Sequence, residues 1–346
     1  MDKFEEISSK PHLNGPTQQH YVPSFYLKGF TSGDVLTVFD RINGEIRHRQ
    51  KPQNVATVRH LYTFEDNQDR KRFDWEVLFG HVESAATPVL KALANGEPLS
   101  QEAREAFAIF LGLAAVRTPA ALAETSTVYT ELIKARTRVA GSDEDRVLEF
   151  LRKMKGSDGN EAVLRGEARD VAALAREGDF DVKLNDDFVL HRSLSLWTIV
   201  SEALVKRDWM ILHATGNDQS FLTSDSPIVL MSRSSELRSQ PIGYGSPHAQ
   251  ILFPLTSKCA LVASGSLGRT GRCDIAVDAL HRFNMAIAQN CRRFVIGGDA
   301  DLVQRVTSDL GLAGTEWQPK SSVEVRFDTG EGGVLSESGV VRRMGF

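Results

Sequence analysis

The chain has 346 residues, of which 41% are hydrophobic and 25% charged, proportions that are typical of a folded globular protein and exclude an intrinsically disordered one. Its net charge of −4 gives no general attraction to nucleic acids or acidic membranes, so such a partner would need a local basic patch. Cys259, Cys273 and Cys291 are too few and too scattered for a disulfide framework or a paired CxxC metal site.

Two features of the sequence bear on where the protein is located. Residues 1–6 are charged and lack the apolar segment of a secretory signal. We find no apolar run that approaches the roughly 20 residues needed to cross a bilayer. We therefore expect a cytoplasmic protein with buried thiols and no membrane partner.

The segment 19–30 combines a histidine, a proline and an apolar run. Pro23 restricts the residue before it to extended conformations, so His20 and Tyr21 are expected on a stiff, extended approach. Pro23 is also a favoured first residue of a helix, and the apolar residues after it predict a short helix that docks on a core. Residues 1–18 are polar and predict a flexible arm.

A β section follows the short helix. Two alternating runs, 35–40 and 46–49, lie on either side of Asn43 and Gly44, the strongest short-range signal for a β-hairpin. Residues 60–64 predict a third strand.

Helical periodicity then predicts helices over residues 73–93, 100–116, 119–140 and 188–206. Ser100 is a good N-cap for the second of these, and Pro88 is expected to kink the first. Residues 141–187 are charged and interrupted by glycines, which predicts a solvated insertion or lid.

A period of two returns at Asp208. We expect a second hairpin from 209–213 and 220–223, strands over 228–230, 249–255, 259–263 and 293–296, and helices over 275–291 and 302–310. The tail 313–346 is Gly-rich and contains one or two strand-like runs.

The segregation of strands from helices favours an α+β fold over a parallel doubly wound sheet. The sections are an N-terminal β-hairpin section (19–72), a helical middle (73–206) and a C-terminal antiparallel or mixed sheet with helices (207–312). We expect these sections to form one domain, 19–312.

Motifs of high specificity, such as GxxxxGK[ST], GxGxxG, HExxH and GxSxG, are absent from the sequence. The remaining candidates are individually weak. His20 beside Tyr21 is a general acid or base next to a phenol, or else a histidine packed at a helix start.

Glu76 and Glu83 are seven residues apart, so they share one helix face above Gly80. This pair would bind a divalent metal or share a proton, or else it is a solvated stripe. Arg117, at a helix end, is either a clamp for a carboxylate or phosphate or a charge that complements the helix dipole.

Small polar residues interrupt a buried-looking strand at Thr223, Ser224 and Asp225. Polar groups in an apolar strand are costly unless paired, so this run is either a site or a capped turn. Asn284 lies on a mostly apolar helix face, where a buried structural amide is the default interpretation.

The run His20-Tyr21-Val22-Pro23 resembles an uncharacterised, mainly bacterial family, domain of unknown function 4238, whose hallmark is an HYVP motif. Further stretches resemble the family in the same order: Pro52-x-Asn54, Glu76, Glu83, Arg117-Thr118-Pro119, Phe221 to Pro227, Phe253-Pro254-Leu255 and Asn284. The resemblance implies that the histidine, the two glutamates, the arginine and Asp225 lie near one another. It implies no particular reaction.

We therefore expect a catalytic site made of His20, Glu76, Glu83, Arg117 and Asp225, with substrate bound by Tyr21, Thr223, Ser224 and Asn284. A histidine, carboxylates and an arginine are the groups that phosphoester hydrolysis needs. This set favours a phosphodiesterase or nuclease-like hydrolase that acts on a nucleic acid or nucleotide, in a bacterial defence setting. A divalent metal, if used, would be held by Glu76, Glu83 and Asp225.

The alternative hypothesis is a non-catalytic protein whose structural polar network binds a small anionic ligand or a partner protein. A nucleic acid would need a basic strip, for which Arg47, Arg49, Lys51 and Arg59 are the candidates. The same residues also suit a charged sheet edge that prevents aggregation.

Overall fold

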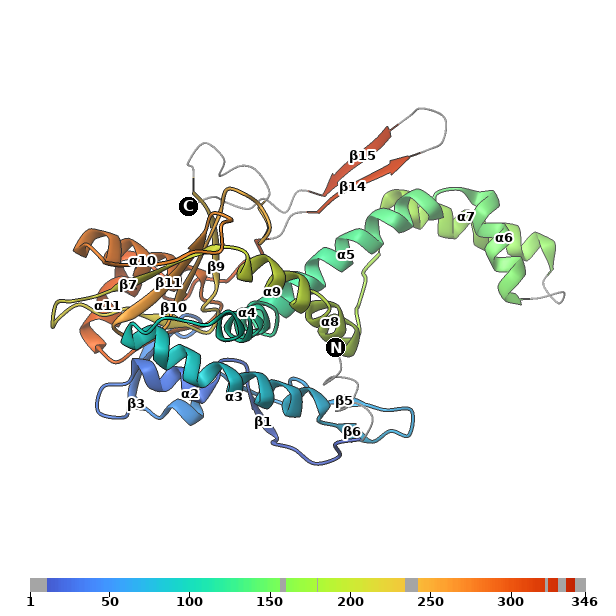
Figure 1. The fold of residues 1–346 in the computed structure, drawn as a ribbon. Helices are drawn as coiled ribbons and strands as arrows, with labels where there is room; N and C mark the ends of the chain where they lie inside the picture. The colour runs from blue at the N-terminus through green and yellow to red at the C-terminus, as the bar shows by residue number, and fades with distance from the viewer. Residues whose placement is uncertain are drawn as a thin grey trace. The chain divides into compact units, whose positions relative to one another are not determined.

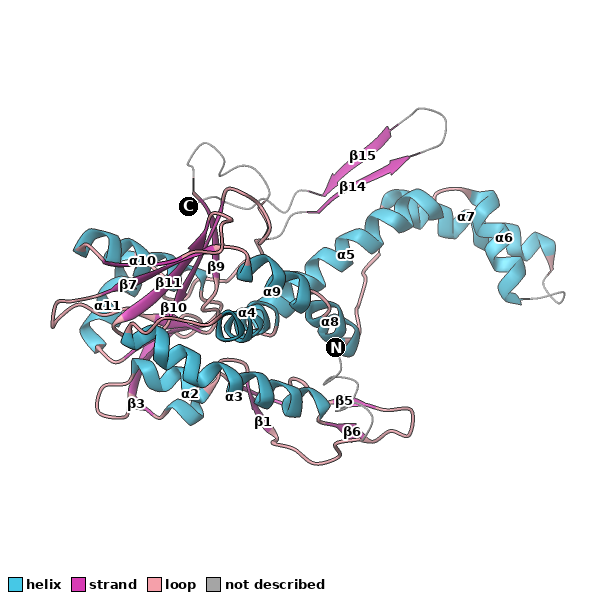
Figure 2. Ribbon diagram, viewed as in Figure 1, coloured by secondary structure: helices cyan, strands magenta, loops and turns pink. Residues whose placement is uncertain are grey.

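The computed structural model describes residues 11–155, 160–178, 180–233, 242–320, 323–328 and 334–339. It confirms the predicted α+β fold, with strands at both ends of the chain and helices between them (Figure 2). The described residues divide between two compact units. The first is drawn from Met1–Leu122 and Leu190–Gln318, and the second from Ala123–Val189 and Pro319–Met344.

The opening segment of the first unit has the predicted extended approach and short helix, but Pro23 is the N-cap of that helix and not its first residue. Strand β1 (Gln18–His20) pairs antiparallel with β4 (Thr57–Arg59), which makes the approach extended. Pro23 then precedes the short helix α2 (Ser24–Leu27) with an extended backbone, φ −61° and ψ 140°. Within residues 1–18, which were expected to form a flexible arm, the Thr17 carbonyl accepts a hydrogen bond from His60 N at 2.9 Å.

The predicted N-terminal hairpin is present as β2 (Leu36–Asp40) and β3 (Glu45–Gln50). In its turn Gly44 takes a positive φ of 68°. The hairpin joins β13 (Phe294–Gly297) and β8 (Thr223–Ser224) in the order β3-β2-β13-β8 among the described strands. Strands from opposite ends of the chain therefore share one antiparallel sheet.

The predicted third strand over 60–64 is wrong. Strand β4 ends at Arg59, and His60 takes a left-handed φ of 53°. Tyr62 N donates to the side chain of Gln19 at 2.7 Å, so the backbone turns here. Strand β5 (Phe64–Glu65) then pairs with β6 (Lys71–Arg72).

The first three predicted helices are confirmed as α3 (Asp74–Asn95), α4 (Gln101–Val116) and α5 (Pro119–Gly141). Ser100 caps α4 as expected, because its hydroxyl accepts from Ala103 N at 3.2 Å. Pro88 lies inside α3, and Gly96 ends that helix with φ 84°.

The single helix predicted over 188–206 is two helices, α8 (Asp186–Leu194) and α9 (Trp197–Val205). A turn separates them, and the Trp197 indole donates to the Ile109 carbonyl of α4 at 2.7 Å. This bond fixes the start of α9 on α4. Helix α4 packs against both α3 and α9 (Figure 1).

The second sheet of the first unit is mixed, and its described strands are ordered β12-β7-β11-β10-β9. Their bounds are β7 Asp208–His213, β9 Val229–Ser232, β10 Ala249–Pro254, β11 Cys259–Ser264 and β12 Thr270–Asp274. Strand β12, which was not predicted, pairs parallel with β7, and the other neighbours are antiparallel. This arrangement confirms the predicted β10 and β11.

The predicted hairpin between 209–213 and 220–223 is wrong. Strand β7 pairs with β11 and β12, while β8 pairs with β13 of the other sheet. Leu222 N donates to the Asn284 side chain at 2.9 Å. The polar run 223–225 begins in β8 of the four-stranded sheet, and the chain continues into β9 of the five-stranded sheet.

The main core lies where α4 meets the mixed sheet. Phe107 of α4 packs edge-on against Trp209 and Phe253, with ring centroids 6.0 and 6.4 Å apart. The predicted C-terminal helices are present as α10 (Val277–Asn290) and α11 (Ala300–Asp309). They bury Val303 and Val306 in a smaller core against the four-stranded sheet.

The second unit contains α6 (Glu144–Lys155) and α7 (Glu161–Glu177), and the predicted insertion 141–187 lies within it. The two helices pack through Val147, Leu148, Leu164 and Ala168. The strand-like runs of the tail are present as β14 (Val323–Asp328) and β15 (Val334–Gly339), an antiparallel pair.

One helical segment in the described part of the chain, Asp186–Val205, is long and apolar enough by composition to cross a membrane. It consists of α8 and α9. The bent pair α4 and α5 passes the same test only when taken together, across a bend of 63°. Core helices of globular proteins also pass this test, so it does not by itself indicate a membrane protein.

Candidate functional site

Helix α3 brings two of the candidate carboxylates together. Trp75, Leu78 and Phe79 are buried on the core face of this helix, and Glu76 and Glu83 are half-buried at the border of that face. Gly80 lies between them, and a Cβ added there would meet no atom within 4 Å. The helix face between the two glutamates is therefore open, as their spacing predicted.

Arg117 follows the last residue of α4, and its side chain is fully buried, at 0% exposure. Its Nη1 donates to Glu83 Oε1 at 2.8 Å. The guanidinium also lies over the Phe79 ring, 5.4 Å from the centroid. The Arg117 carbonyl accepts a hydrogen bond from the Tyr62 hydroxyl at 2.8 Å. These contacts hold the arginine in one place.

The other edge of this guanidinium is unpaired. Arg117 Nε and Nη2 are both buried and have no hydrogen-bond partner among the described residues. These two N–H groups point the same way, and this edge binds carboxylates and phosphates through two parallel hydrogen bonds. Each buried donor left unpaired costs about 1–3 kcal/mol, so the edge is suited to an anionic ligand.

His20 lies in the same cluster, at the end of β1. Burial is the largest influence on its pKa and lowers it, the backbone of Gln53 and the charge of Glu83 raise it, and Arg117 lowers it. Its Nε2 atom is buried and has no hydrogen-bond partner in the described part of the chain. The ring is therefore neutral near pH 7 and presents a free nitrogen.

Glu76 completes the cluster. Burial raises the pKa of Glu76 to about 7, while the charge of Arg117 opposes this shift and that of Glu83 adds to it. Burial also raises the pKa of Tyr62 well above its usual range, so this phenol remains a hydrogen-bond donor. We refer to His20, Tyr62, Glu76, Glu83 and Arg117 as the Arg117 cluster.

Asp225 has different partners. It is 2% exposed, and its two carboxylate oxygens accept from the backbone N–H groups of Arg292 and Arg293, at 2.9 and 2.8 Å. Burial raises the pKa of Asp225 to about 6, although these amides act to lower it. Burial is the main cause of the raised pKa of Tyr21, and the charges of Asp225 and Tyr62 add to it, so Tyr21 lies near both groups.

The expected metal set of Glu76, Glu83 and Asp225 does not form one group. In the part of the chain that the structure describes, no group of three or more His, Cys, Asp or Glu side chains could hold a metal ion. Glu83 instead pairs with Arg117, and Asp225 with backbone amides.

The expected substrate-binding residues of the 223–284 region are paired within the fold. Thr223 Oγ1 lies 2.7 Å from the Tyr26 hydroxyl, and Ser224 Oγ accepts from Ser226 N at 3.2 Å. The amide of Asn284 accepts from Leu222 N and donates to the Ser220 carbonyl at 2.8 Å. The interpretation of Asn284 as a buried structural amide fits these bonds.

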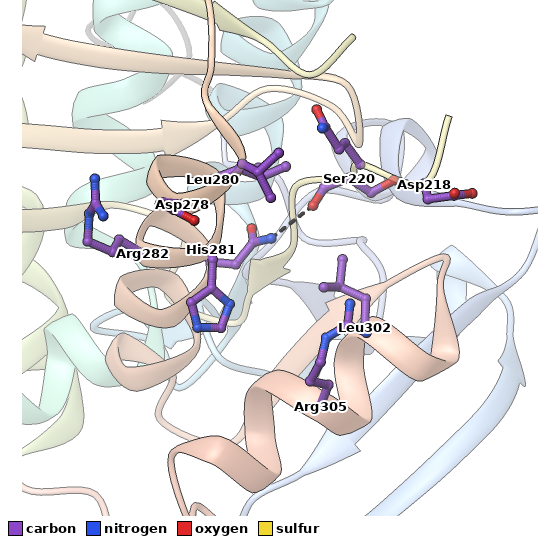
Figure 3. A pocket seen from close by; sticks show the side chains of 11 residues that line it. Asp218, Ser220, Asp278, Leu280, His281, Arg282, Leu302 and Arg305 are labelled. Atoms are coloured by element: carbon purple, nitrogen blue, oxygen red, sulfur yellow. Dashed lines mark hydrogen bonds between the residues drawn. The ribbon is translucent and has the colours of Figure 1, made fainter. Parts of the chain in front are cut away.

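Asn284 also lines a pocket of about 480 Å³ between α10, α11 and residues 218–220 (Figure 3). Leu280 and Leu302 contribute apolar surface, and the exposed side chains of His281 and Arg305 face one another from the two helices. The residues of the Arg117 cluster do not line this pocket.

Two further buried arginines, Arg104 and Arg207, were not predicted. Arg104 donates to the carbonyls of Val205 and Arg207 and to the Thr270 hydroxyl, and its guanidinium lies 4.1 Å from the Trp209 ring centroid. Arg207 donates to the backbone carbonyls of Tyr244, Ser246, Ala249 and Gly265. Each arginine stands beside other charged residues in the sequence, and nothing local reveals partners that lie 37–58 residues away for Arg207 and 101–166 residues away for Arg104.

The chain was compared with family models, with curated proteins and with solved structures. The model of the family "Protein of unknown function (DUF4238)" matches residues 18–301. The chain belongs to this family. The matched region includes the whole Arg117 cluster, Asp225 and Asn284, and excludes the tail. No curated protein and no solved structure matches the chain.

Proposed function

We propose that the Arg117 cluster binds an anionic group of a substrate and carries out acid–base chemistry on it, as a phosphodiesterase or nuclease-like hydrolase. One observation carries this proposal. A fully buried guanidinium has two unpaired nitrogens, and its charge acts on the pKa of both His20 and Glu76, two groups suited to proton transfer near neutral pH.

Three members of the cluster have direct roles in such a hydrolysis. Arg117 holds the phosphate and stabilises the negative charge that develops on it. His20 accepts the proton of the attacking water at Nε2, because the backbone of Gln53 acts on the other ring nitrogen and favours the tautomer protonated there. Glu76, half protonated near pH 7, donates its proton to the leaving oxygen.

Partial pairing distinguishes this cluster from a purely structural network. A structural network would be closed to solvent and fully hydrogen-bonded. Here Glu83 keeps 25% of its side chain exposed, the space above Gly80 is open, and three buried nitrogens of Arg117 and His20 lack partners among the described residues.

The second candidate is a non-catalytic protein that binds a small anion at the same place. The pairing of Asp225 with backbone amides favours it, because that removes one of the five expected catalytic side chains from the cluster. Anion binding without turnover by the purified chain would support this candidate.

The basic strip expected for a nucleic acid is only partly available. Arg47 pairs with the buried Asp40 at 2.9 Å, and Asp40 also accepts from Arg293. The other three candidates, Arg49, Lys51 and Arg59, are exposed. A short oligonucleotide or nucleotide therefore suits the chain better than a long duplex.

The test is a hydrolysis screen on RNA, DNA and nucleotide phosphoesters with the wild type, His20→Ala, Glu76→Gln and Arg117→Lys. His281→Ala and Arg305→Lys are matched controls, because they change exposed residues outside the cluster. We expect each cluster variant to lose hydrolysis by about 100-fold or more and both controls to keep it. Full hydrolysis by His20→Ala and Arg117→Lys would contradict the proposal.

A further inference from the structure

We propose that the group bound at Arg117 is a singly charged phosphodiester, held while Glu76 carries a proton. This inference rests on the proposed function and names which class of phosphate ester the same site accepts. It is supported by the charges in the Arg117 cluster and by the number of unpaired hydrogen-bond donors there.

The charge balance of the cluster leaves little positive charge for a ligand. Arg117 is its one permanent cation, and Glu83 is paired with it at 2.8 Å. Glu76 adds a second carboxylate, and burial keeps His20 neutral. A phosphodiester brings one negative charge, whereas a phosphomonoester carries close to two above its second pKa of about 6. Burying a second uncompensated charge is expensive, which favours the diester.

The donor geometry agrees with the charge. Arg117 offers two parallel free donors, Nε and Nη2. A phosphodiester presents two non-bridging oxygens, and these match the two donors in a bidentate contact. A monoester presents three terminal oxygens, one of which would remain beyond this edge. The Nε2 lone pair of His20 is an acceptor in the neutral ring, so it faces the attacking water rather than the phosphate.

The protonation state of Glu76 depends on the charged groups around it. These are Glu83 on the same helix and Arg117 at the end of α4, and Glu76 in turn acts on Tyr62 in the turn after β4. A ligand charge at Arg117 adds to that of Glu83 and weakens the compensation that Arg117 gives Glu76. The bound state therefore favours protonated Glu76. Because the pKa of Glu76 is about 7, we expect the affinity for a diester to fall about tenfold from pH 6 to pH 8.

The experiment uses dimethyl phosphate and monomethyl phosphate, which differ by one methyl group and one charge. Their dissociation constants for the full chain are measured at pH 6, 7 and 8 through ligand methyl resonances in NMR. We expect dimethyl phosphate to bind at least about tenfold more tightly than monomethyl phosphate at pH 8, and to weaken about tenfold between pH 6 and pH 8.

Two variants and one control variant test whether Glu76 and Arg117 cause this behaviour. Glu76→Gln should bind dimethyl phosphate with the same affinity at all three pH values, while Glu105→Gln, an exposed glutamate on α4, should behave as the wild type. Arg117→Lys should lose the binding, because an ammonium cannot form the bidentate contact.

The possible failures are distinct. Equal or tighter binding of monomethyl phosphate at pH 8 would overturn the inference and the diester specificity of the proposed hydrolase, while leaving an anion site at Arg117. Dimethyl phosphate binding in the wild type that does not change with pH would overturn the inference and leave the proposed function in place. If neither ester binds, or if Arg117→Lys binds both as well as the wild type does, the inference and the proposed anion site are both overturned.

Discussion

The chain buries arginines in two different ways. In the sheet region, Arg104 and Arg207 are surrounded by backbone carbonyls, and every nitrogen of both guanidinium groups donates to at least one oxygen. In the Arg117 cluster, the guanidinium donates through Nη1 to Glu83, and its other two nitrogens are unpaired among the described residues. All three side chains are at most 5% exposed.

The contrast separates structural arginines from a candidate binding residue. Buried donors are nearly always paired, because each one left unpaired costs about 1–3 kcal/mol. The fold meets this requirement at Arg104 and Arg207 with main-chain carbonyls. An unpaired edge at Arg117 is therefore best explained by a ligand that binds there. Substitutions of the structural arginines should lower stability more than substitutions of Arg117, which should mainly lower activity.

The largest expected effect on stability is at Arg207. Arg207→Met leaves the carbonyls of four residues without their donor, and we expect it to lower the free energy of unfolding by about 3–5 kcal/mol. Arg117→Met loses one ion pair to a partly exposed glutamate and removes two unpaired donors, so we expect a loss of only about 1 kcal/mol. Urea denaturation of both variants measures the difference. Equal losses would remove the distinction between the two regions.

Asp225→Ala should have the next largest effect. It leaves the partly buried N–H groups of Arg292 and Arg293 without an acceptor, and we expect a loss of about 2–3 kcal/mol in the free energy of unfolding at pH 7. The same denaturation measurement tests it. A variant with wild-type stability and no hydrolytic activity would instead place Asp225 in the catalytic machinery.

Glu76→Gln should change how stability depends on pH. The pKa of Glu76 is about 7 in the folded chain and near 4.5 when unfolded, so between these values the folded state keeps a proton that the unfolded state has lost. Stability contributed by this group is therefore present below pH 4.5 and lost as pH rises to 7. We expect Glu76→Gln to raise the free energy of unfolding by about 2 kcal/mol at pH 8 and to leave it unchanged at pH 4.

Melting temperatures of this variant and the wild type across pH 4–8 would show the effect. Parallel curves over that range would mean that Glu76 titrates normally and is not part of a buried cluster.

His20→Asn should have the smallest effect on stability. The Nε2 atom of His20 makes no hydrogen bond with the described residues, and the asparagine amide can replace the ring nitrogen that bonds the Gln53 backbone, so the change should cost less than about 1 kcal/mol. Hydrolysis should nevertheless fall by about 100-fold or more. A large drop in melting temperature would instead support a structural role for this histidine.

Local signals in the sequence predicted much of the fold. The N-cap Ser100, the apolar period of α4 and the strands β10 and β11 were predicted because each depends on neighbouring residues. The pairing of β2 with β13 and the return of β8 to the same sheet were not. Such pairings join strands that are far apart in the sequence. The residues next to each strand do not determine which distant strand it pairs with.

The candidate site also combines features that local spacing predicted with contacts between distant residues that it did not predict. Glu76 and Glu83 could be placed on one face by helical spacing alone, whereas their meeting with His20 and Arg117 was expected only from the family resemblance. The cost of burying polar groups indicated that Thr223 and Asp225 need partners, but it did not show that those partners are Tyr26 and the backbone at 292–293. Tyr62 was not expected in the site, because its turn replaces a predicted strand.

The most direct test of the ligand-binding edge is the Arg117 Nε–H resonance itself. It can be assigned in NMR spectra by its loss in Arg117→Lys and followed during titration with dimethyl phosphate. We predict a downfield shift and slower exchange with solvent at Arg117, with the Nε–H signals of Arg104 and Arg207 unchanged. Saturation of binding with no change at Arg117 Nε–H would contradict the account.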